Sequence, residues 1–412
     1  MDLKNIIDKK EKAAKYIIDE ITHVIKTCGK RDPGSEGEKK SCEYMAEVLK
    51  DCGCEDVKVE GYEVAPKAFY GWIYFTITFV LISVAAFFFV PVVGIPLITL
   101  GFVLVLLQFG VYKKVLDPFF KKKTSHNVTA IKKCKGETKR RIIFNGHPDA
   151  TWEWPVNYAL GGVGFEGHAI IVVLGALFYL VLSIMYVAQN GITAGLPDLE
   201  NPLVKAGLWG LLFVPFMIGL YFMENYKLVV DGANDNLTGC YMGIAVLKYL
   251  KDAGIELENT EVGVILTGSE EIGLRGAKAW VEAHKDEFKD VPTFIYSFDT
   301  INEPKYLMAN YRDLNGTVKS DAEVADLFYE AAQEVGVPCK KGWIPPLGGA
   351  VDAAAFTQGG FRAAGVTGLN HKLERYYHTR LDNVESLNKD GIANCFAATV
   401  KTLEMFDNGA KQ

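Results

Sequence analysis

Seven residues of the types that bind metal ions or move protons lie at or beyond the ends of predicted strands or at the start of a predicted helix. In chain order they are His147, Asp149, Asp235, Glu270, Glu271, Asp299 and His378. Singly, each has an ordinary structural explanation, because an aspartate before a helix is commonly an N-cap and a lone histidine is commonly a polar residue with satisfied hydrogen bonds. Their recurrence at the strand ends of one sheet instead predicts a site for metal or proton-transfer chemistry.

The spacing of these residues fits a metal site. Asp149 lies two residues beyond His147, so its carboxylate can accept the second ring N–H of a metal-binding histidine. Asp235 stands in a turn rich in glycine and asparagine, where it can present its two oxygens to two cations. Glu270 and Glu271 are adjacent, so their side chains diverge, and one can reach a metal while the other reaches water on the metal. Such nitrogen and oxygen ligands suit zinc, with manganese or cobalt as weaker options.

The segments around these residues alternate between strand and helix. Residues 141–145, 261–266 and 293–298 are predicted strands, and predicted helices of ten or more residues include 241–250 and 322–335. This alternation predicts an α/β fold with a mixed, mostly parallel central sheet covered by helices on both faces. Functional residues in such folds gather at the carboxyl ends of the strands.

Five motifs, taken in this order, resemble the M28 family of zinc metallopeptidases, the co-catalytic dizinc aminopeptidase type. They are Gly146-His147-Pro148-Asp149, Gly232-Ala233-Asn234-Asp235-Asn236, Ser269-Glu270-Glu271, Ser297-Phe298-Asp299 and Tyr377-His378-Thr379. The segment from Arg31 to Gly37 also resembles the family's entry into its first helix. The match covers roughly residues 21–66, 125–150 and 230–405, and it implies the zinc aminopeptidase fold.

The resemblance also implies a role for each candidate residue. One zinc ion is expected on His147, Asp235 and Asp299, and a second on Asp235, Glu271 and His378, so that Asp235 bridges the two. Glu270 is expected to be the general base. Asp149 is expected to belong to the catalytic site as well, where its carboxylate accepts the second ring N–H of His147. Bound zinc lowers the pKa of water to ~7, which makes it a nucleophile near neutral pH. The implied reaction is hydrolysis of peptide bonds, with removal of N-terminal residues.

Two departures from the family pattern leave alternatives open. Pro148 stands where an aromatic residue is common, and the stretch from Gly348 to Ala353 keeps Asp352 but lacks the histidine that often follows it. The second departure lies on the substrate side of the family's site and affects specificity. A carboxypeptidase or other amidohydrolase, or a single-zinc glutaminyl cyclase-like enzyme, is the first alternative. A non-enzymatic membrane receptor, scaffold or transporter is the second.

Long apolar segments interrupt the enzyme-like sequence. The run from Ala68 to Tyr112 contains no charged residue. Since a helix crosses a bilayer with ~20 apolar residues, this run can cross twice, with a turn at Pro91–Pro96. Two further blocks, 168–187 and 206–223, form a second pair. We therefore predict about four transmembrane helices in two hairpins, 67–123 and 166–223, inserted into a catalytic peptidase domain of residues 1–66, 124–165 and 224–412.

Composition and charge limit the partners and the location. A net charge of −6 argues against nucleic-acid binding. The eight cysteines are scattered, which favours reduced thiols, and the charged segment Met1–Glu20 leads us to expect no secretory signal peptide. The first hairpin is flanked by Lys67, Lys113, Lys114 and Lys121–Lys123. This pattern predicts an integral protein of a bacterial-type plasma membrane with a cytoplasmic catalytic domain. The expected partners are a peptide substrate and the lipid bilayer.

Overall fold

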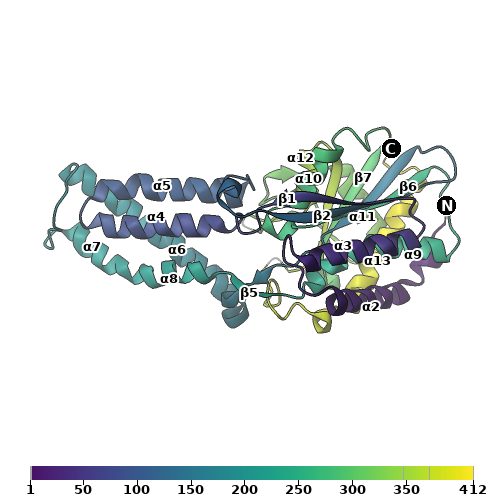
Figure 1. Ribbon diagram of the computed structural model, residues 1–412, viewed down its shortest axis with the longest axis horizontal. Coiled ribbons are helices and arrows are strands. Elements are labelled where there is room, and N and C mark those ends of the chain that lie inside the picture. The colour runs from purple at the N-terminus through teal and green to yellow at the C-terminus, as the bar shows by residue number, and fades with distance from the viewer. Residues whose placement is uncertain (1, 347, 371, 412) are drawn as a thin grey trace. The chain divides into compact units, whose positions relative to one another are not determined.

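The computed structural model describes residues 2–346, 348–370 and 372–411. The chain divides into two compact units, which are treated separately below (Figure 1). The first, here called the sheet unit, comprises Met1–Pro66, Lys122–Glu153 and Lys227–Gln412. The second, here called the helical unit, comprises Lys67–Lys121 and Trp154–Tyr226.

An eight-stranded sheet forms the centre of the sheet unit, in the order β1-β2-β6-β3-β7-β12-β8-β11. The strands β6, β3, β7 and β12 run parallel in the middle, whereas β1 and β2 continue the sheet antiparallel on one side. Their bounds are β1 Asp56–Val64, β2 Lys123–Lys132, β3 Arg140–Gly146, β6 Thr260–Thr267, β7 Thr293–Ile301, β8 Met308–Asn310, β11 Lys340–Gly342 and β12 Arg362–Gly368. The predicted mixed, mostly parallel sheet is confirmed.

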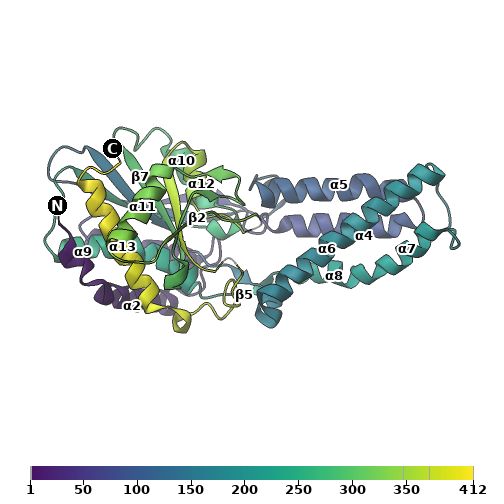
Figure 2. The same ribbon diagram turned by 180° about the vertical axis from the view of Figure 1, so that it is seen from behind.

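Helices cover both faces of this sheet (Figure 2). The larger layer contains α2 (Lys10–Cys28), α3 (Glu36–Asp51), α9 (Thr238–Asp252), α11 (Ala322–Glu334) and α13 (Lys389–Asp407). Its core includes Phe144, Tyr296 and Phe298 from the strands. On the opposite face, α10 (Arg275–His284) packs against α12 (Ala353–Gln358). There the Trp280 indole donates a hydrogen bond of 2.9 Å to the Thr129 hydroxyl.

The strand register determines which residues meet at the carboxyl edge of the parallel strands. Asn145 in β3 lies level with Ile265 in β6 and with Ser297 in β7. The next residues of these three strands therefore leave the sheet side by side. Asp299 in β7 in turn lies level with Thr367 in β12. This shared edge is where the candidate residues come together.

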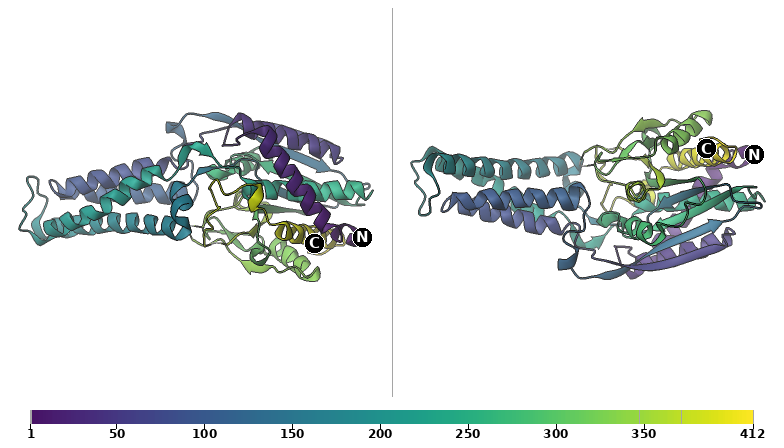
Figure 3. Two further views of the ribbon diagram at one scale, coloured as in Figure 1. Left: turned by 90° about the horizontal axis from the view of Figure 1, so that it is seen from below. Right: turned by 90° about the horizontal axis from the view of Figure 1, so that it is seen from above.

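Four long helical stretches run antiparallel in the helical unit (Figure 3). The first is α4 (Gly71–Phe87), and the second is α5 (Gly94–Val105) continued by the π-helical turn η2 (Leu106–Gly110). The third is α6 (Pro155–Asn190), and the fourth runs through α7 (Pro202–Gly210), η4 (Leu211–Phe213), α8 (Val214–Gly219) and η5 (Leu220–Phe222). Backbone angles at Gly161 (φ 70°, ψ 179°) break α6 near its start.

The turn between α4 and α5 differs from the predicted one. It occupies residues 88–93 and includes a short 3-10 helix, η1 (Pro91–Val93), while Gly94 already begins α5. Pro96 is therefore inside the first turn of α5 rather than in the turn between the helices. A proline costs little there, because the first N–H groups of a helix have no intrahelical partner.

Glycines let the helices of this unit approach closely. A Cβ at Gly101 in α5 would lie 3.1 Å from a methyl carbon of Thr76 in α4, and one at Gly175 in α6 would lie 2.7 Å from Phe213. The Thr76 hydroxyl also donates a hydrogen bond of 3.2 Å to the Gly101 carbonyl. Small residues at helix crossings and a side-chain hydrogen bond between helices are the contacts that hold helices together in lipid.

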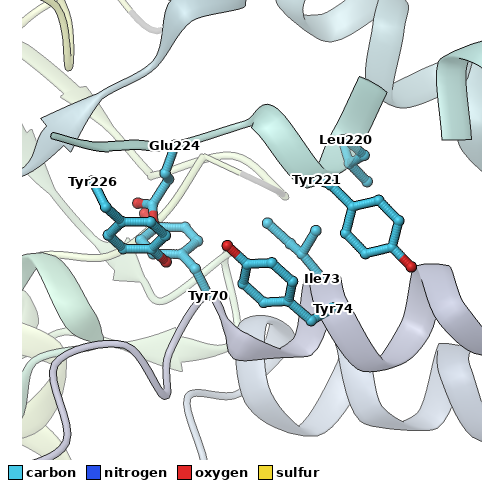
Figure 4. Close-up of a pocket in the computed structure, with 7 residues that line it drawn as sticks. All are labelled: Tyr70, Ile73, Tyr74, Leu220, Tyr221, Glu224 and Tyr226. Carbon is cyan, nitrogen blue, oxygen red and sulfur yellow. The ribbon is translucent and has the colours of Figure 1, made fainter. Parts of the chain in front are cut away.

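A small cavity lies at the end of the helical unit where α4 begins and η5 ends (Figure 4). Tyr70, Tyr74, Tyr221, Tyr226 and Glu224 contribute to its lining. Its volume is about 10 Å³, which is space for a single water molecule. The cavity is therefore part of the packing of this tyrosine-rich end and is too small to be a ligand site.

Three helical stretches are long and apolar enough to cross a membrane: Pro91–Gly110, Pro155–Asn190 and Pro202–Phe222. This finding rests on length and composition only. The fourth predicted crossing, Gly71–Phe87, is apolar but has 17 residues. At 1.5 Å per residue it is ~26 Å long, slightly less than the ~30 Å hydrocarbon core of a typical bilayer.

Candidate metal centre

The seven candidate residues meet at the carboxyl edge of the parallel strands. His147 and Asp149 follow β3, Asp299 lies near the end of β7, and the two glutamates begin the 3-10 turn η7 (Glu270–Ile272) after β6. Asp235 lies in the turn η6 (Ala233–Leu237) that precedes α9, and His378 lies between β12 and α13. Each of the seven is at most 9% exposed. The structure thus brings all of them together in a buried site.

Asp235 lies between the two histidines. One of its carboxylate oxygens, Oδ1, is 3.3 Å from Nε2 of His147, and the other, Oδ2, is 3.2 Å from Nε2 of His378. Each oxygen therefore faces a different imidazole. This is the arrangement needed for one carboxylate to be shared by two cations.

The remaining acidic residues divide between the two histidines. Asp299 Oδ2 is 3.7 Å from His147 Nε2, and Glu271 Oε2 is 3.1 Å from His378 Nε2. Glu270 Oε2 is 3.7 Å from His147 Nε2. Glu270 and Glu271 thus point to different histidines.

Two groups of side chains have ligand atoms close enough together to hold a metal ion each. They are His147 with Asp235 and Asp299, and Asp235 with Glu271 and His378; within each group the ligand atoms lie within 4.8 Å of one another. Glu271 Oε1 is buried and has no hydrogen-bond partner among the described residues, so one strong acceptor remains for a cation. These imidazole and carboxylate donors fit zinc.

The electrostatics of the site also favour a cation. Burial raises the pKa of Glu270 well above its usual range, and repulsion from Asp352 and Asp299 adds to this effect. Burial and the neighbouring Asp235 raise the pKa of Glu271 to about 7. Burial alone would lower the pKa of His378, but the surrounding carboxylates outweigh it and raise this pKa to about 10. A bound cation would stabilise the ionised carboxylates that these shifts disfavour.

Asp149 connects the loop after β3 to the turn that carries Glu270 and Glu271. Its Oδ1 lies 3.3 Å from Nδ1 of His147, on the side of the ring opposite Asp235. The same carboxylate accepts hydrogen bonds from the backbone N–H groups of Glu270 (3.1 Å) and Glu271 (3.2 Å). Asp149 therefore orients the imidazole and the glutamate pair at once, which is more than its position beyond His147 predicted.

Two positioning residues were not identified from the sequence. The buried Arg31 guanidinium donates to the carbonyls of Pro148 (2.7 Å) and Asp231 (2.6 Å), which ties the loop after β3 to the turn before Asp235. The buried Asp382 carboxylate accepts hydrogen bonds from the backbone N–H of Asn234 (2.8 Å) and Asp235 (3.1 Å). Both sets of contacts join segments more than a hundred residues apart in the chain. The spacing of residues within one motif therefore could not indicate them.

A third positioning residue, Glu38, supports the turn that carries the glutamate pair. Its carboxylate accepts hydrogen bonds from the hydroxyls of Ser269 (2.9 Å) and Ser125 (3.0 Å) and from the backbone N–H of Gly34 (2.9 Å). Ser269 has a φ of 53°, in the left-handed region that L-residues seldom adopt. Glu38 thus helps to hold the strained residue that directly precedes Glu270.

Asp352 lies beside the predicted residues. It is buried and accepts a hydrogen bond from the hydroxyl of Thr267, the last residue of β6. Burial raises its pKa to about 7. In the sequence Asp352 is only the retained residue of a family motif, and the structure adds it to the acidic groups around the site.

Comparisons with known proteins agree with this fold. Residues 221–403 match the model of Peptidase family M28, which confirms the resemblance predicted from the motifs. No curated protein matches the sequence.

Among solved structures, the fold is similar to those of several enzymes. A zinc aminopeptidase from Bacillus subtilis is 15% identical, with 95% of each chain covered and a TM-score of 0.56. An aminopeptidase from Aneurinibacillus sp. strain AM-1 is 14% identical, with 97% of this chain and 95% of that chain covered and a TM-score of 0.55. Glutaminyl cyclase from Bacteroides thetaiotaomicron is 12% identical, with 96% of each chain covered and a TM-score of 0.53. At these identities the similarity concerns the fold.

Replacing Asp149 by Asn should weaken metal binding without unfolding the protein. The amide is nearly the same size, but its NH₂ group would face either the imidazole or a backbone N–H of the glutamate pair. Loss of the hydrogen-bond acceptor for a metal-binding histidine typically lowers the affinity for the metal ion by ~10–100-fold. A competition titration with a zinc chelator measures this change.

The matched control for this experiment is Asp321→Asn, which alters an aspartate that caps α11 of the same unit. Zinc affinity should be unchanged in the control. Wild-type affinity in Asp149→Asn, with both variants folded, would contradict the role given to Asp149.

Proposed function

We propose that this protein, whose residues 221–403 match Peptidase family M28, is a membrane-anchored dizinc metallopeptidase that removes residues from the N-terminus of peptides. The observation that carries the proposal is the pair of ligand groups that share Asp235. The zinc aminopeptidase-like fold supports it. A glutaminyl cyclase-like reaction is the alternative on this scaffold, and it would need only one of the two groups.

The roles of the side chains follow from their positions. Two zinc ions, held as described above, would supply Lewis-acid activation of the attacking water and of the scissile carbonyl. Glu270 belongs to neither ligand group, yet its Oε2 lies 3.7 Å from His147 Nε2. This position supports a role for Glu270 as the general base, which would accept the proton of the attacking water and pass it to the nitrogen of the departing amine.

The helical unit supplies the anchor. Large apolar side chains project from its helices, including Val163 (86% exposed), Trp209 (76%), Leu212 (68%) and Phe222 (67%). In water, so many exposed apolar side chains would favour aggregation, whereas in a bilayer they contact acyl chains. With three helices of sufficient length and a fourth that is only slightly shorter, these side chains support insertion into a membrane.

The charges of the helical unit set its expected orientation. Lys67, Lys113, Lys114 and Lys121 lie before α4 and after η2, near the two ends of the segment Lys67–Lys121, where the chain leaves and re-enters the sheet unit. The connection from α6 to α7 contains Asp198 and Glu200 but no lysine or arginine. Basic flanks stay in the cytoplasm, so the sheet unit would be cytoplasmic.

Replacing Glu270 by Gln should abolish catalysis while zinc remains bound. The amide is nearly isosteric but cannot accept the proton, and a general base typically contributes ~10²–10⁴-fold to the rate. Replacing Glu271 by Gln should instead reduce zinc binding, because it removes a charged ligand from the group containing His378. Zinc content and kcat of both purified variants distinguish the two roles.

The two glutamate variants are each other's control. Zinc loss in Glu270→Gln together with retention in Glu271→Gln would show that the roles are reversed. A wild-type protein that is fully active with one zinc ion would favour the cyclase-like alternative.

Peptides with a free N-terminus should be cleaved, and the same peptides acetylated at the N-terminus should resist. Amidation of the C-terminus should have no effect, because the enzyme is proposed to act from the other end. Matched peptides incubated with the detergent-solubilised protein and analysed by mass spectrometry measure both. The opposite pattern would identify a carboxypeptidase.

A cysteine introduced at Gly191, in the connection after α6, should react with a membrane-impermeant thiol reagent in intact cells. A cysteine at the exposed Lys58 of the sheet unit should react only after the cells are permeabilised. Cys134 and Cys339 are changed to Ser first, because these two are partly exposed while the other six cysteines are buried. Labelling at Lys58→Cys in intact cells would place the sheet unit outside the cytoplasm.

A further inference from the structure

The segment after η2, residues 111–121, folds into a defined loop rather than an extended linker. The buried Gln108 side chain holds it: Nε2 donates to the carbonyl of Ala68 (3.1 Å), and Oε1 accepts from the backbone N–H groups of Val115 (3.1 Å) and Leu116 (3.3 Å). The loop also contains a 3-10 turn, η3 (Asp117–Phe119). We call residues 111–121 the basal loop.

The two phenylalanines of the basal loop have different environments. The Phe120 ring packs against the start of α4, where a Cβ at Gly71 would lie 2.5 Å from it. Phe119 is 72% exposed, although its ring centroid lies 6.4 Å from that of Phe75 in α4. The fixed loop thus holds one large apolar ring outward, beside the outer surface of a proposed transmembrane helix.

The basal loop is also basic. It contains Lys113, Lys114 and Lys121 and a single acidic residue, Asp117. All three lysines are exposed, and within the described ranges neither Lys113 nor Lys121 forms an ion pair. The next two lysines differ, because Lys122 pairs with Glu63 and Lys123 with Asp32, 3.8 Å away. The charges of Lys113 and Lys121 are therefore available to an outside partner.

Aromatic residues mark the depth at which the basal loop lies. Phe69 contacts Tyr112 and Phe109, with ring centroids 4.8 and 6.1 Å apart, and Trp72 lies 5.9 Å from Phe109. Tyrosine and tryptophan gather at the boundary between headgroups and acyl chains. This cluster joins the start of α4 to the end of η2, so in a bilayer Lys113 and Phe119 would lie near this boundary.

We propose that the basal loop is a binding surface for anionic phospholipid headgroups, a proposal that rests on the membrane anchoring proposed above. Lys113 and Lys121 would neutralise the headgroup phosphates, with Lys114 adding to the positive charge of the loop, and Phe119 would enter the acyl boundary beside α4. Charge complementarity selects an anionic lipid over a zwitterionic one. The exposed Phe119 selects a lipid surface over a free phosphate ion, which has no apolar part to contact it.

The proposal is tested by measuring the unfolding temperature of the protein in an uncharged detergent. Increasing amounts of phosphatidylglycerol or phosphatidylcholine with the same acyl chains are added, and the rise in unfolding temperature gives the affinity for each lipid. Each lysine near an anionic surface is worth about fivefold in affinity, so the three together predict a preference for phosphatidylglycerol on the order of 100-fold. The variant Lys113→Gln/Lys114→Gln/Lys121→Gln should lose this preference. So should the wild type in 1 M NaCl, where charges are screened beyond ~3 Å.

Two further variants separate charge from apolar contact. The control Lys12→Gln/Lys58→Gln/Lys285→Gln removes three exposed lysines of the sheet unit and should keep the preference. Phe119→Ser should reduce the stabilisation against thermal unfolding by both lipids to the same extent. Equal effects of the two lipids on the wild type, loss of preference in the control variant, or full stabilisation by inorganic phosphate alone would each overturn the proposal.

Extraction of cell membranes with alkaline carbonate separates this proposal from the one on which it rests. Protein that is released by carbonate is not an integral membrane protein, and then the anchoring itself is wrong. Protein that stays in the membrane but shows no preference for phosphatidylglycerol leaves the anchor intact and overturns only the headgroup site.

Discussion

The site depends on the placement of one carboxylate between two imidazoles. Asp235 presents one oxygen to His147 and the other to His378, at 3.3 and 3.2 Å. A buried carboxylate in this position is favourable only if positive charge lies on both sides. The hydrogen bonds from Asp235 and Asn234 to Asp382, the Arg31 guanidinium between two loops, and the parallel strands that end at one edge all serve to keep that geometry.

The helical unit is inserted without disturbing this arrangement. Its first segment lies between β1 and β2, and its second runs from the end of β4 (Trp152–Glu153) into the start of β5 (Asn225–Val229). None of the seven site residues lies in either segment. The unit is held together by its own contacts, such as Gly101 against Thr76 and Gly175 against Phe213. A long apolar unit can thus be inserted into this α/β fold while the strand ends that carry the candidate site remain adjacent.

Features that depend on local sequence were predictable. The strands expected at 141–145, 261–266 and 293–298 occur as β3, β6 and β7, because hydrophobic runs bounded by polar turns specify them. Five of the seven site residues followed from their positions at strand ends, whereas Asp235 followed from its position before a helix and His378 from its position beyond the last strand. The structure adds that the ligand atoms of each group converge, and the metal-binding roles stay predictions.

Features that depend on long-range contacts were not predictable. The side chains of Arg31 and Glu38 form hydrogen bonds with loops that are far away in the chain, and the residues next to them in the sequence do not indicate these contacts. The turn predicted at Pro91–Pro96 lies at residues 88–93 in the structure, because a proline is tolerated in the first turn of a helix.

The shared position of Asp235 is tested most directly by an anomalous diffraction map at the zinc edge, from crystals grown with saturating zinc. It should show two peaks ~3.5–4 Å apart on either side of Asp235. A single peak, or two peaks that do not share Asp235, would contradict it.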